Sequence, residues 1–116
     1  MPHGGCTAIW KNRHGCRVEL YVLEIGPGLF SVTALAGEPG ATPARCIQQG
    51  PFDGEEVAAG CCRAIGASLA NKGYEAETGD TTRHWELCAH RAAREIQQRR
   101  VAFTPDTRFR PEDVNL

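Results

Sequence analysis

Four side chains of metal-binding type fall on two segments with helical periodicity. His84 and Cys88 are four residues apart, so both project from one side of a helix. Cys61 and Cys62 lie on the preceding helical segment and could complete a tetrahedral zinc site with them, because thiolates and imidazole nitrogens are common zinc ligands. The alternative for Cys61 and Cys88 is core packing, since each falls on an apolar stripe, and we expect this role for them.

A second set of potential metal ligands lies near the N-terminus: His3, Cys6, His14 and Cys16. Neither set contains the two-residue-spaced cysteine pair that marks most structural zinc sites. We therefore expect no cofactor, and zinc binding remains an alternative.

Thiol chemistry is the other possibility that the cysteines raise. A disulfide between the adjacent Cys61 and Cys62 would be strained in a helix, and a redox role would need an exposed thiol of lowered pKa. His14 and Cys16 could share one face of a strand, but nothing in the sequence orients the histidine. The sequence contains no phosphate-binding loop and no obvious carboxylate pair, so we expect a non-enzymatic protein.

Arginines are concentrated in the last third of the chain. Residues 83–110 contain seven arginines and three acidic residues, whereas residues 19–80 contain nine acidic and three basic residues. Arginine matches phosphate geometry well, so a nucleic-acid-binding strip is one interpretation. A solvated helix face is the interpretation we favour, because stacking aromatic residues are few. The strip would consist of Arg91, Arg94, Arg99, Arg100, Arg108 and Arg110.

Length and composition indicate the kind of domain in which these residues are positioned. The chain has 116 residues, 41% of them hydrophobic, and a net charge of -1, which fits one globular domain and disfavours polyanion binding by the whole surface. We see no secretory signal and no apolar run long enough to span a membrane. These features predict a cytoplasmic protein with reduced cysteines and no membrane association.

Alternating apolar and polar residues predict strands in the first half of the chain. We expect them at residues 7–11, 16–25, 29–35 and 45–49, with a turn at Gly26-Pro27-Gly28. The fold class is therefore α+β, with a three- to four-stranded antiparallel sheet at the N-terminal side.

Two helices are predicted to follow the sheet, over residues 53–72 and 81–100. Asp53 and Glu56 match a capping box, and Phe52 and Val57 are spaced for a hydrophobic staple. We expect both helices on one face of the sheet, the face that carries Val18, Leu20 and Val22. Residues 1–103 would form a single domain, followed by a polar tail at 104–116.

The opposite face of the sheet is the candidate interaction surface. Tyr21, Leu23 and Ile25 would leave an apolar patch there unless the second helix or the tail covers it. The leading hypothesis is a small binding or regulatory protein that acts through protein contacts, as a homodimer. Its layout of a hairpin followed by helices recurs in many small bacterial domains and does not assign a function.

Overall fold

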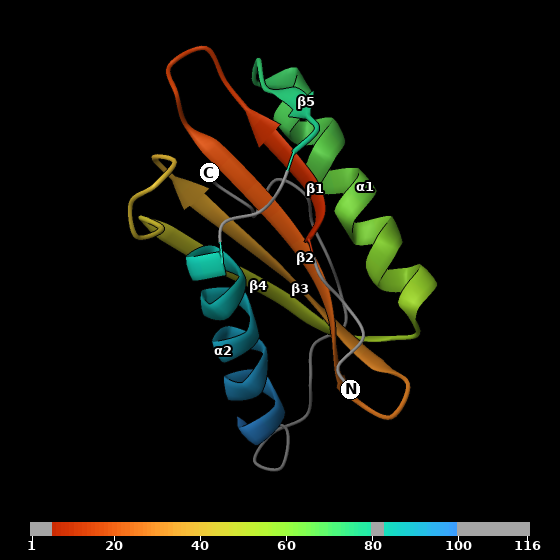
Figure 1. Ribbon diagram of the computed structural model, residues 1–116. Helices are drawn as coiled ribbons and strands as arrows, with labels where there is room; N and C mark the ends of the chain where they lie inside the picture. The colour runs from red at the N-terminus through yellow and green to blue at the C-terminus, as the bar shows by residue number, and fades with distance from the viewer. Residues whose placement is uncertain (1–5, 80–82, 100–116) are drawn as a thin grey trace.

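The computed structural model describes residues 6–79 and 83–99 (Figure 1). In these residues, no helix is long and apolar enough to cross a membrane. The elements follow the order β1 (Cys6–Lys11), β2 (Arg17–Gly26), β3 (Leu29–Gly37), β4 (Arg45–Asp53), α1 (Glu55–Asn71), β5 (Glu75–Glu77) and α2 (Arg83–Arg99).

The strands form one antiparallel sheet in the order β4-β3-β2-β1-β5. The α+β class and the predicted antiparallel sheet are confirmed, and the turn at Pro27-Gly28 joins β2 to β3. The expected three to four strands are too few. The additional strand, β5, has a short Glu-Ala-Glu sequence and lies at the outer edge of β1, where no apolar alternation is required.

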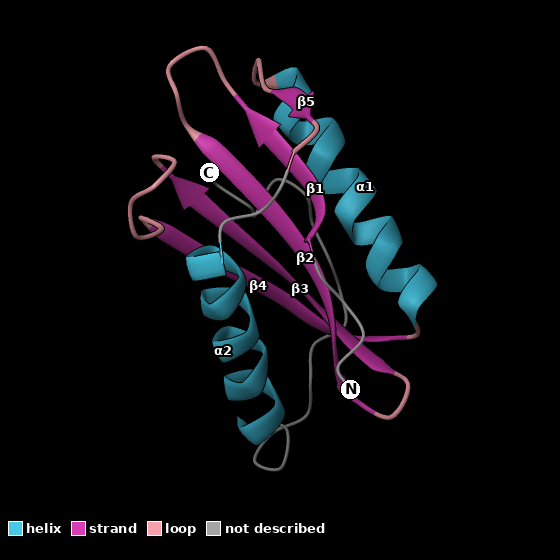
Figure 2. Cartoon of the chain, viewed as in Figure 1, coloured by secondary structure: helices cyan, strands magenta, loops and turns pink. Residues whose placement is uncertain are grey.

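Helices α1 and α2 cover opposite faces of the sheet, as Figure 2 shows. Helix α1 packs on the face that carries Val18, Leu20 and Val22, as expected for the first helix. Helix α2 packs on the other face, where Trp85 and Ala89 meet Tyr21 and Leu23. The expectation that both helices share one face is therefore wrong.

Strands β2 and β3 explain this arrangement, because side chains on both of their faces are buried. Tyr21, Leu23 and Ile25 are 0–2% exposed beneath α2. The predicted interaction patch on this face is thus part of the core, and the alternative that the second helix covers it is correct. Burial of three large side chains provides a hydrophobic driving force for α2 to cross to this side.

The start of α1 differs from the sequence pattern. Asp53 is the last residue of β4 and pairs with Leu29, while Gly54 occupies the N-cap position with φ 103° and no side-chain capping bond. Glu55 and Glu56 occupy the first turn, where the helix dipole favours acidic residues. Phe52 is buried and Val57 is 53% exposed, which argues against the predicted staple between them.

Two glycines of α1 give a matched test of this packing. A Cβ atom at Gly66 would lie 2.8 Å from Cζ2 of Trp10, whereas one at Gly60 meets only the flexible end of Arg63 at 3.6 Å. Gly60→Ala should stabilise the protein by about 0.5–1 kcal/mol through helix propensity. Gly66→Ala should destabilise it by about 1–3 kcal/mol, because the indole must move. Urea unfolding measures both, and equal effects would contradict the contact with Trp10.

Candidate functional site

A groove lies between β4 and α2. Helix α2 packs mainly on β2 and β3, so it leaves part of the sheet beside it uncovered on this face, whereas α1 contacts all five strands. The groove has a volume of about 550 Å³. Its lining comes from β3, the β3–β4 loop, β4 and α2, and consists of Leu35, Thr42, Pro43, Cys46, Gln48, Cys88, Arg91, Ala92 and Glu95.

The register of β4 determines which of its side chains enter the groove. Cys46 pairs with Leu35 and Gln48 with Thr33, so both project to the α2 face, while Ile47 packs against the α1-side core. In the described part of the chain, β4 is hydrogen-bonded to β3 on one side only. The groove therefore borders an open strand edge.

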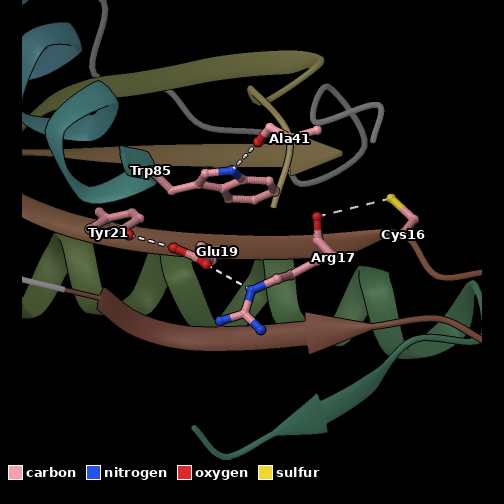
Figure 3. A network of polar contacts seen from close by, with 6 residues as sticks. All are labelled: Cys16, Arg17, Glu19, Tyr21, Ala41 and Trp85. Atoms are coloured by element: carbon pink, nitrogen blue, oxygen red, sulfur yellow. Dashed lines mark hydrogen bonds and ion pairs between the residues drawn. The ribbon is translucent and has the colours of Figure 1, made fainter. Parts of the chain in front are cut away.

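Trp85 holds the wall and the rim of the groove together. Its indole is 1% exposed, and its Nε1–H donates a hydrogen bond of 2.7 Å to the carbonyl oxygen of Ala41 (Figure 3). Ala41 lies in the β3–β4 loop, next to Thr42 and Pro43, which form the rim. This bond ties the first turn of α2 to the loop.

A buried carboxylate lies under α2 on the same face. Glu19 is fully buried, and its Oε2 accepts a bond of 2.7 Å from Nε of Arg17, while the Tyr21 hydroxyl donates to Oε1 (Figure 3). All three residues come from β2 at two-residue spacing, so they share one face. The network neutralises the carboxylate within the fold, and it does not open into the groove described above.

Two hydroxyl groups add to the polarity of this face. Ser31 and Thr33 are fully buried, and within the described residues their hydroxyl oxygens have no hydrogen-bond partner. The cluster on the α1 side, in contrast, consists of apolar side chains and Tyr74.

Charged groups meet at the wall of the groove. Burial raises the pKa of the Cys46 thiol, and the negative charges of ionised Cys88 and Glu95 raise it further. Arg91 lines the same wall one helical turn from Glu95. The lining of the groove thus includes a cation, an anion, the Gln48 amide, two thiols and the apolar side chain of Leu35.

The predicted metal ligands are divided between the two faces. Cys61 and Cys62 belong to the α1-side core, whereas Cys88 packs against the α2-side core. The sheet separates them, so these cysteines and His84 do not form one site. Burial, with a smaller effect of Cys62, raises the pKa of Cys61 to about 12, which makes it a poor ligand or sensor. Among the described residues, no group of three or more potential ligands is placed to hold a metal.

The second predicted set is only partly described. His3 and the side chain of Cys6 lie outside the described part, and His14 is exposed in the turn after β1. Cys16 accepts a hydrogen bond of 3.5 Å from the Tyr74 hydroxyl. Burial, followed by this contact with Cys16, raises the pKa of Tyr74 to about 12.

Only part of the predicted arginine strip lies among the described residues. Arg91 lines the groove and Arg94 is exposed on α2. The side chain of Arg99 lies outside the described part, as do residues 100, 108 and 110, the other three arginines of the strip.

Sequence reasoning missed the groove and its residues Cys46, Gln48 and Glu95. Two signals existed: the alternation at 45–49 places Cys46 and Gln48 on one face, and the spacing of Cys88, Arg91 and Glu95 places them on one side of a helix. The sequence did not show that these two faces are adjacent, because that depends on the side of the sheet that α2 covers.

The fold and the groove define a small α+β domain whose sheet lies between two helices and whose edge strand β4 is paired on one side only within residues 6–79 and 83–99. The chain belongs to the family of PA4575-like proteins, whose family model matches residues 6–113. Searches of curated proteins and of solved structures found no match.

The buried ion pair predicts a specific loss of stability. Arg17→Met removes the cation but retains an apolar stem, so the buried Glu19 loses its ion-pair partner. We expect a loss of about 3–5 kcal/mol in the free energy of unfolding. Arg45→Met, on an exposed arginine of β4, is the control and should change it by less than about 0.5 kcal/mol. Denaturant unfolding measures the free energy of unfolding of both variants. Equal losses in the two variants would show that the Arg17–Glu19 ion pair does not stabilise the fold.

Proposed function

We propose that this chain is a non-enzymatic protein-binding domain that takes up an extended segment along β4. The observation that supports this proposal is the groove of about 550 Å³ beside an open strand edge. Addition of a strand to a sheet edge uses main-chain hydrogen bonds for affinity, and pockets for alternate side chains give specificity. The groove supplies such a pocket on one side of the added strand.

The first partner to test is a second copy of the chain, which corresponds to a homodimer. Strand β5, at the other edge, has only three residues, whereas β4 offers Arg45–Gln49 before the irregularity near Pro51. In an antiparallel pair centred on Ile47, the two Ile47 side chains meet and Arg45 lies opposite Gln49 of the other copy. No like charges face each other in this register.

A charge placed in the groove tests this proposal. Gln48→Lys brings two ammonium groups into the paired region, and we expect the dimer dissociation constant to increase at least about tenfold. Gln97→Lys makes the same change on an exposed position of α2 that does not line the groove, and should leave association unchanged. Sedimentation equilibrium over a range of protein concentrations measures both.

Two outcomes count against the homodimer. A wild-type chain that stays monomeric at millimolar concentration contradicts self-association through β4. Equal weakening by Gln48→Lys and Gln97→Lys places the interface elsewhere. In the monomeric case, a display library of extended peptides tests for a different protein partner, and loss of binding in Gln48→Lys would assign it to the groove.

Nucleic-acid association through the arginines is the alternative. The exposed Arg94 and the groove residue Arg91 lie on one helix, with further arginines following in the sequence. This alternative requires retention on heparin that decreases steeply with salt, and loss of that retention in Arg99→Ala/Arg100→Ala. Weak retention with no change in the double variant favours the protein-binding proposal.

A further inference from the structure

Two cysteines from elements far apart in the sequence line the same groove. Cys46 is on β4, with its side chain on the α2 face and exposed, and Cys88 is on α2, half-buried against the core beneath that helix. Both side chains line the same groove, and the negative charge of ionised Cys88 contributes to raising the pKa of Cys46.

The other described thiols are in different surroundings. Cys61 and Cys62 are adjacent on α1 and 2% and 5% exposed in the core. Cys16 accepts a hydrogen bond from Tyr74 at the opposite face of the sheet. Of the cysteine side chains that the structure describes, only Cys46 and Cys88 come from two elements and line one open cavity.

We propose that Cys46 and Cys88 are a dithiol site that a low-molecular-weight disulfide converts reversibly into a Cys46–Cys88 disulfide. The exposed Cys46 thiolate attacks one sulfur of the reagent, forms a mixed disulfide and releases one thiolate. The Cys88 thiolate then attacks Sγ of Cys46, the protein disulfide forms, and the second reagent thiolate leaves. Two protein thiols are oxidised, one reagent disulfide is reduced to two thiols, and a dithiol reagent reverses both steps.

The bond would change the groove in a defined way. It joins the wall at Cys88 to the floor at Cys46 and draws α2 over the part of β4 that it leaves open. A strand added along β4 could then no longer place side chains between them. This effect on binding rests on the proposed function, whereas formation of the bond does not.

The charges around Cys46 predict the pH dependence of the reaction. Burial opposes ionisation of Cys46, and so do the negative charges of ionised Cys88 and of Glu95 on α2. Arg91 on the same helix lines the groove, and the neighbours on the sheet, Leu35 and Gln48, are uncharged. Because the pKa of Cys46 is raised, the thiolate is scarce near neutral pH. The rate of bond formation should therefore increase from about pH 7 to about pH 9.

The test uses the full chain with oxidised glutathione as the probe. After oxidation, free thiols are alkylated and the protein is digested without reduction for mass spectrometry. We expect a peptide pair linked through Cys46 and Cys88, the loss of two of the six thiols, and recovery of both with dithiothreitol. Cys46→Ser and Cys88→Ser should each abolish the linked pair. Cys16→Ser is the control and should retain it, since a serine hydroxyl can still pair with Tyr74.

The outcomes separate this proposal from the proposed function. Retention of all six thiols, a different intramolecular linkage, or only an intermolecular Cys46–Cys46 bond would overturn the dithiol site, whatever the groove binds. If the Cys46–Cys88 bond forms and reduced protein associates through β4, oxidation should weaken association at least about tenfold, and unchanged association would refute closure of the groove. If the bond forms but reduced protein binds no partner, the dithiol site stands and the proposed function fails.

Discussion

The packing of Trp85 against the sheet is the interaction on which the candidate site depends. Its indole is almost fully buried among the side chains beneath α2, and its N–H group bonds to the carbonyl of Ala41. The apolar area of one tryptophan contributes on the order of 3 kcal/mol or more to docking of the helix, and the hydrogen bond fixes where along the sheet it docks. The wall of the groove on α2 and its rim at Thr42 and Pro43 are therefore positioned by the same side chain.

Local sequence patterns predicted the strands β1 to β4 and both helices, because each pattern depends only on the residues of its own segment. The alternation over residues 16–25 and the helical spacing of Trp85, Cys88 and Ala92 needed no knowledge of their partners. The side of the sheet that α2 covers could not be predicted from such local patterns. Strand β5 carries the chain along the outer edge of β1 before α2 begins, and its three residues have no strand pattern of their own. Without β5, a second helix on the same face as α1 is the simpler interpretation.

The candidate site was hidden for a related reason. Cys46 and Gln48 are recognisable as one face of a strand, and Cys88 and Glu95 as one side of a helix, but a groove exists only where the two surfaces meet. The sequence suggests a metal site that combines Cys88 with Cys61 and Cys62, because all three lie on predicted helices. In the structure, Cys61 and Cys62 lie on one side of the sheet and Cys88 lies on the other. Residue type identified possible chemistry, and the strand register with the docking of α2 decided which groups share a cavity.

The difference in polarity between the two sheet faces explains why this register is specified. A slip of one residue in β2 would turn Arg17, Glu19 and Tyr21 together toward the α1-side core, where the packed residues are apolar apart from Tyr74. Moving this ion pair among apolar side chains costs several kcal/mol in desolvation, which is a large part of the stability of a small domain. The polar side chains of this strand face therefore favour the register in which that face of β2 meets α2. Through the pairing of β2 with β3 and of β3 with β4, the same preference extends to the side of the sheet on which Cys46 and Gln48 project.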